Sequence, residues 1–113
     1  NEALDLYRTH STVDTLDYAN AVRYPAVVKN RLGKRDESTA LWEEACRRYE
    51  EVGIHEGVAE GAAWLTKFAL ERNDVPAARR WFETASLASS LSNDPATHKF
   101  VDEVRRQLEE IDD

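Results

Sequence analysis

The chain has few of the residues that build disulfides, zinc sites or phosphate loops. Its single cysteine, Cys46, cannot form a disulfide within the chain, and no Cys-x-x-Cys pair exists. The three histidines lie more than forty residues apart, and none has a His or Cys at the i, i+4 spacing of a helical zinc site. The four glycines form no phosphate-binding loop. We therefore expect no metal and no cofactor.

The sequence also lacks an arrangement of residues that is suited to catalysis. A nucleophilic Cys46 would need a lowered pKa and a nearby base, and no neighbour in sequence supplies either. Paired acids such as Glu43 and Glu44 point in different directions on a helix, whereas acid–base catalysis needs two carboxylates in contrasting environments. We therefore expect that the chain is not an enzyme.

The net charge is −7, so the chain lacks the excess of cations that phosphate backbones and anionic lipid surfaces attract. No apolar run approaches the roughly 20 residues of a membrane span. We expect neither nucleic acid nor membrane among the partners. A lone cysteine is compatible with a reducing compartment, so we expect a cytoplasmic protein.

The composition is that of one folded domain. The 113 residues are 42% hydrophobic and 33% charged, and three Trp, four Tyr and three Phe argue against disorder. Strand-like alternation is absent, while Ala, Glu, Arg and Leu dominate. We expect a single all-α domain over residues 1–113.

The sequence repeats itself weakly at a spacing of forty residues. The segment LWEEA at 41–45 matches WFETA at 81–85. The same register pairs further positions: Tyr24 with Trp64, Val28 with Phe68, Gly33 with Asn73, and Gly53 with Asn93. Repetition at this period is typical of a solenoid, which usually presents a surface for holding another molecule.

Apolar spacing and breaker residues predict six helices, over 2–10, 14–32, 37–52, 55–72, 76–91 and 95–111. The second helix should bury Ala19, Ala26 and Leu32, and Pro25 should kink it or divide it in two. The last helix has one apolar side (Phe100, Val101, Val104, Leu108 and Ile111) and one charged side, as a terminal capping helix requires.

Helix ends follow from local residue chemistry. Gly33 and Gly53 should each end a helix in the left-handed conformation. Asp36 should cap the helix that follows Gly33. Pro76 suits a first helical turn, where its missing N–H has no partner to lose, and Asp94-Pro95 should start the last helix.

The helix pairs resemble tetratricopeptide repeats. The residues that carry the resemblance in the second pair are Ala62, Leu65, Thr66, Ala69, Ala78, Phe82 and Ala85. Those in the first pair are Val22, Pro25, Ala26, Lys29, Ser38, Trp42 and Ala45, of which Pro25 and Lys29 depart from the pattern. The forty-residue spacing exceeds the usual length of about 34 and is similar to the longer repeats of kinesin light chain-like members.

This resemblance, over roughly residues 1–93, implies a right-handed superhelix of antiparallel helix pairs. The expected parts are a partial unit or N-terminal helix at 1–10, a first unit at 14–53, a second unit at 54–93 and a capping helix at 94–113. In this family the first helix of each unit lines the concave groove. The groove positions carried over are Asn20, Arg23, Val27, Asn30, Arg31, Glu60, Ala63, Lys67, Leu70 and Glu71.

The resemblance implies a non-catalytic module that binds a partner peptide or helix in its concave groove. Arginine and asparagine side chains can hold a peptide carboxylate or backbone there. Two alternatives stay open. The chain could be a scaffold that self-associates as a homo-oligomer through Ala3, Leu6 and Tyr7, or a regulatory module of a larger multidomain protein.

Overall fold

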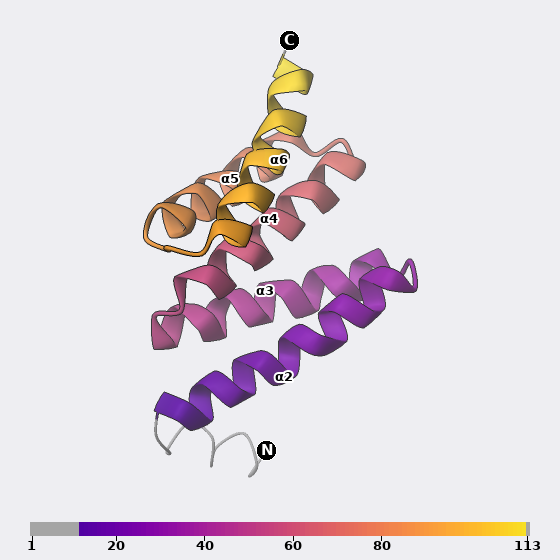
Figure 1. Ribbon diagram of the computed structural model, residues 1–113. Helices are drawn as coiled ribbons and strands as arrows, with labels where there is room; N and C mark the ends of the chain where they lie inside the picture. The colour runs from indigo at the N-terminus through magenta and orange to yellow at the C-terminus, as the bar shows by residue number, and fades with distance from the viewer. Residues whose placement is uncertain (1–11, 113) are drawn as a thin grey trace. The chain divides into compact units, whose positions relative to one another are not determined.

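The computed structural model describes residues 12–112, and these residues form helices and no strand (Figure 1). The helices are α2 (Thr12–Arg31), α3 (Arg35–Val52), α4 (His55–Glu71), α5 (Val75–Ser90) and α6 (Pro95–Asp112). The all-helical prediction is therefore confirmed. The predicted helix at 2–10 lies outside the described residues. None of the helices between residues 12 and 112 is long and apolar enough to cross a membrane.

The chain divides into two compact units, Asn1–Ile54 and His55–Asp113. In the first unit α2 packs along α3, and in the second α4 packs against both α5 and α6 (Figure 1). Each unit is described separately below.

Pro25 lies inside α2, and the helix continues through it from Thr12 to Arg31 without a break. The alternative of two shorter helices is therefore wrong. Because proline has no N–H, α2 lacks one backbone hydrogen bond at this turn.

Three helix ends share one hydrogen-bond pattern. Gly33, Gly53 and Asn73 have positive φ angles of 76°, 71° and 61°. At each end the left-handed residue donates to the carbonyl three residues back, and the next residue donates to the carbonyl five back, at 2.9–3.2 Å. This Schellman arrangement satisfies carbonyls that the helix end would leave unpaired. It recurs at Gly33 and Asn73, forty residues apart.

The pattern does not extend to Asn93. The cap of α5 is Leu91, with φ −94° and ψ 0°, and Asn73 is the one non-glycine residue of positive φ within residues 12–112. Side chains organise this connection instead. The Ser92 hydroxyl accepts from the backbone N–H of Asp94 at 3.1 Å, and the Thr97 hydroxyl donates to the Asp94 carboxylate at 2.7 Å.

The two units differ in how α3 and α5 begin. The predicted cap Asp36 is wrong, because α3 starts at Arg35 and its cap residue Lys34 makes no side-chain hydrogen bond. Asp36 lies in the first turn, where a negative charge is favourable beside the helix dipole. In the second unit the residue forty positions after Lys34 is Asp74, which caps α5. Its Oδ1 accepts a hydrogen bond from the Ala77 N–H at 3.2 Å. Pro76 lies in that first turn, as predicted.

Small, aliphatic and aromatic side chains form the two cores. Those of the first unit are Ala19, Ala26, Trp42, Ala45, Cys46 and Tyr49. Those of the second unit include Leu65, Phe68, Ala69, Ala78, Ala85, Val101, Val104 and Leu108. Two predicted core residues lie at the surface, since Leu32 is 63% exposed beyond the end of α2 and Ile111 is 49% exposed near the end of α6.

Candidate protein-binding surface

The ten residues predicted to bind a partner lie on α2 and α4, the first described helix of each unit. On α2, Asn20 and Arg31 are exposed, whereas Arg23, Val27 and Asn30 are half-buried. On α4, Glu71 is exposed, Glu60, Lys67 and Leu70 are half-buried, and Ala63 is fully buried. Ala63 therefore contributes no exposed side-chain surface.

Hydrogen bonds inside the first unit hold its two predicted asparagines. The Tyr49 hydroxyl donates to Oδ1 of Asn20, across 29 residues of sequence. Nη1 of Arg35 donates to both the backbone carbonyl and Oδ1 of Asn30. Both side-chain amide oxygens are thus engaged in the fold, and each amide keeps N–H groups as donors.

Arg23 is held over an aromatic ring. Its guanidinium carbon lies 5.9 Å from the ring centroid of Trp42, a fully buried residue of α3. A cation at this distance is attracted to the negative face of the ring. Arg23 is therefore a positioned cation at the edge of the core, and Arg31 is a solvated cation near the end of the same helix.

The best-defined polar feature of the second unit is Lys67 with its aromatic neighbours. Its Nζ lies 5.2 Å from the Trp64 ring centroid and 5.9 Å from that of Phe100. The centroids of the Trp64 and Phe100 rings are 5.1 Å apart and their planes are tilted by 56°, a favourable geometry for aromatic pairs. We call these three half-buried residues the lysine–aromatic shelf (Lys67, Trp64 and Phe100).

The charge of Lys67 is not neutralised by a neighbouring carboxylate. Within residues 12–112, Lys67 makes no ion pair, and its ammonium group lies over the Trp64 and Phe100 rings. The aromatic faces fix the ammonium group in place without using its hydrogen-bond donors for a carboxylate. The shelf can therefore offer a charge and an apolar face side by side.

Sequence reasoning placed Lys67 on this surface but missed both of its ring partners. Trp64 precedes Lys67 by three residues, and i, i+3 neighbours share one side of a helix, so this contact carried a signal. Phe100 lies on α6, and its place beside Trp64 depends on how α6 packs against α4. No local sequence feature predicts that packing.

The groups with shifted pKa values are not members of the shelf. Burial alone would raise the pKa of Glu44, but hydrogen bonds from Arg48 and Arg47 outweigh it and hold the pKa below its usual range. The hydrogen bond from Thr97 is the main cause of the lowered pKa of Asp94. Glu44 also accepts a long hydrogen bond from the Tyr18 hydroxyl at 3.4 Å, and this bond links α3 to α2.

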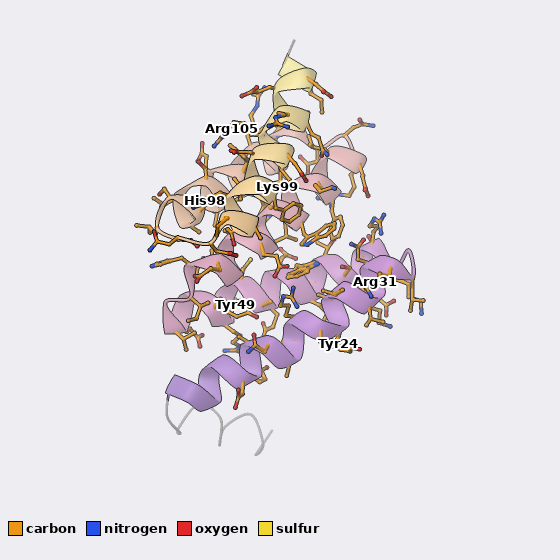
Figure 2. The ribbon with its side chains drawn as sticks, viewed as in Figure 1. Tyr24, Arg31, Tyr49, His98, Lys99 and Arg105 are labelled. Atoms are coloured by element: carbon orange, nitrogen blue, oxygen red, sulfur yellow. The ribbon has the colours of Figure 1, made fainter. Side chains whose placement is uncertain are left out.

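Other reactive side chains are dispersed. Cys46 is a free and buried thiol. Among the side chains that the structure describes, no three His, Cys, Asp or Glu residues are grouped to hold a metal ion. Nε2 of His98 lies 3.0 Å from the carbonyl oxygen of Ser89 and 2.7 Å from that of Ser92, and therefore ties the α5–α6 connection together (Figure 2).

Comparisons of the chain with protein-family models, with curated proteins and with solved structures found no match.

Proposed function

We propose that this chain is a non-catalytic module that binds a peptide or helix of a partner protein. The observation that carries the proposal is the lysine–aromatic shelf on α4 and α6. A positioned, unpaired ammonium group beside two half-buried rings offers complementary contacts to a carboxylate and an adjacent apolar side chain.

The proposed architecture is a tetratricopeptide-like array of antiparallel helix pairs in a right-handed superhelix. The matching Schellman ends at Gly33 and Asn73 support a repeat of forty residues. Two contacts support antiparallel pairing in the first unit. The end of α3 meets the middle of α2 through Tyr49 and Asn20, and the start of α3 meets the end of α2 through Lys29 and Glu37.

In this proposal α6 is the capping helix of the array. Its buried side carries Val101, Val104 and Leu108 against the rest of the second unit. Its other side carries exposed charged residues, including Glu103, Arg105 and Glu109. A polar outer face is what the last element of a repeat array requires for solubility.

The shelf favours a particular class of peptide. The ammonium group of Lys67 attracts a carboxylate, from an Asp or Glu side chain or from a chain terminus. The rings of Trp64 and Phe100 favour a leucine-sized or aromatic side chain next to that carboxylate. We therefore expect bound peptides to pair one acidic group with one large apolar group.

Selection from a random displayed peptide library against the full chain tests this function. Selected peptides should share the acidic–apolar pair, and Lys67→Glu should weaken their binding at least about tenfold, or roughly 1.4 kcal/mol. Lys67→Met keeps the apolar stem over the rings and removes the charge, so it separates the electrostatic contribution from packing. Calorimetric titration of each variant gives the dissociation constants.

Arg80→Glu is the matched control, because Arg80 is an exposed cation on α5 outside the proposed surface. It changes the net charge equally and should leave the affinity within about twofold. Arg23→Glu tests the α2 positions separately and should weaken any selected peptide that depends on them. The proposal fails if no peptide is enriched, or if enriched peptides bind Lys67→Glu as tightly as the unmodified chain.

A further inference from the structure

The α2 helix and the turn after it expose large apolar side chains. Tyr24 is 71% exposed and Leu32 is 63% exposed, and Val28 lies half-buried between them. These residues are four positions apart, so they follow one side of the helix over about 12 Å. Figure 2 labels Tyr24 and Arg31 on this helix. We call Tyr24, Val28 and Leu32 the α2 stripe.

The stripe ends in a concentrated positive charge. Residues 29–35 contain four cations, Lys29, Arg31, Lys34 and Arg35, in a chain whose net charge is −7. Lys29 pairs with Glu37 at 3.5 Å, and Arg35 donates to Asn30. Arg31 and Lys34 are exposed and make no ion pair with any described residue. We call residues 29–35 the basic turn.

The end of α6 has the complementary character. Glu109 and Glu110 are exposed, and Ile111 beside them is 49% exposed. The last turn of α6 contains no basic residue. Carboxylates at the C-terminal end of a helix are unfavourable because the helix dipole is negative there, so an incoming cation would relieve this repulsion.

We propose that the α2 stripe and basic turn of one chain dock the end of α6 from a second copy of the chain. Arg31 and Lys34 attract Glu109 and Glu110, while Leu32 and Tyr24 cover Ile111. The charges that oppose this contact are Arg106, one turn before Glu110, and Asp36 and Glu37 beside the basic turn. The contact uses neither Lys67 nor its rings and goes beyond the proposed peptide binding.

The proposed contact is head-to-tail, because the two surfaces that meet are different. Each chain carries one copy of both surfaces, so the contact can repeat into a ring or an open filament. Few residues take part, and interfaces of such small area are weak and transient. Exposed charges are screened by salt, so the association should depend strongly on ionic strength.

Sedimentation velocity of the full chain at increasing concentration tests the proposal. At about 0.02 M salt, where the screening length is roughly 20 Å, the mean mass should rise with concentration. At about 0.5 M salt, where it is roughly 4 Å, the association constant should fall at least tenfold. A chain that stays monomeric at low salt and millimolar concentration overturns the proposal.

Charge reversal identifies the two surfaces. A turn-reversed chain (Arg31→Glu with Lys34→Glu) and an α6-reversed chain (Glu109→Lys with Glu110→Lys) should each lose self-association at least tenfold. An equimolar mixture of the two should associate again, because the reversed turn of one now attracts the reversed helix end of the other. Failure of the mixture to associate overturns the proposed pairing.

Matched controls separate these effects from net charge and general hydrophobicity. Arg72→Glu with Arg80→Glu changes the charge as much as the turn-reversed chain does, at two exposed sites of the second unit, and should leave association within about twofold. Leu32→Ser should weaken association, whereas Leu87→Ser, at a residue that is 66% exposed on α5, should not. Association that persists in the turn-reversed chain would assign self-contact to another surface.

Discussion

The two compact units end α2 and α4 in the same way but hold their helices together differently. In the first unit, polar groups join α2 to α3. The Ser38 hydroxyl donates to the Ala26 carbonyl at 2.8 Å, Tyr49 donates to Asn20, and Arg48 lies 4.7 Å from the Tyr18 ring centroid. In the second unit, α4 buries mainly apolar residues, and α6 packs against both α4 and α5.

This difference has consequences for how each unit responds to change. Hydrogen bonds and ion pairs depend on pH, on salt and on partner geometry, and their net contributions are modest. Apolar burial depends on shape and volume, so removal of a large core side chain leaves a cavity. The second unit should therefore be the more sensitive to truncation of its core, and the first unit to removal of a hydrogen-bond or ion-pair partner.

The largest expected effect is that of Phe68→Ala in the second unit. Phe68 is 2% exposed and packs beside Trp64 with ring centroids 5.9 Å apart. Loss of a buried phenyl ring should lower the free energy of unfolding by about 3–5 kcal/mol. Hydrogen exchange should accelerate more in α4, α5 and α6 than in α2 and α3.

Leu87→Ala is the control for Phe68→Ala, since Leu87 is 66% exposed on α5. It should change the free energy of unfolding by no more than about 0.5 kcal/mol. Equal effects of the two substitutions, in chemical denaturation followed by circular dichroism, would contradict the assignment of Phe68 to the core.

A smaller effect is expected at the helix starts that distinguish the units. Asp74→Ala removes the cap of α5 and should cost about 1 kcal/mol, within the range of about 0.5–2 kcal/mol for such caps. Lys34→Asp places a capping carboxylate before α3 and should raise the free energy of unfolding of the first unit by part of that amount. Unfolding midpoints in urea measure both, and stabilisation by Asp74→Ala would contradict the cap.

The smallest effect is the pH dependence that Glu44 gives the first unit. Arg48 and Arg47 lower the pKa of Glu44 from its usual 4.5, so the folded state favours the ionised carboxylate. This contribution is present above pH 4.5 and is lost as the pH falls through the lowered value. Glu44→Gln should remove about 0.2–1 kcal/mol at neutral pH and flatten the acid limb of the stability curve.

Unfolding free energies between about pH 3 and pH 6 measure this limb. Glu103→Gln is the control, because Glu103 is exposed and makes no ion pair within residues 12–112. An acid limb that is equally steep in Glu44→Gln and in the unmodified chain would place the pH dependence elsewhere.

Sequence reasoning located the ends of the described helices to within two residues, because helix ends depend on nearby residues. The left-handed ends at Gly33 and Gly53 were predicted, whereas the left-handed Asn73 was not, although the forty-residue register pairs it with Gly33. The cap at Asp36 was misplaced, since Lys34 precedes α3 without a side-chain bond and Asp36 falls inside the helix. Propensity favoured the aspartate, but the backbone turn after Gly33 set the start.

The amino-acid sequence by itself determined the helices, their turns and the acidic balance of the chain, because backbone hydrogen bonding and charge depend on residue type and near neighbours. Tertiary structure alone decided that Phe100 meets Trp64 beside Lys67 and that Tyr49 bonds Asn20. It also decided that Leu32 lies in solvent although its spacing predicted burial. Contacts across about thirty residues depend on how whole helix faces pack, which a local pattern does not encode.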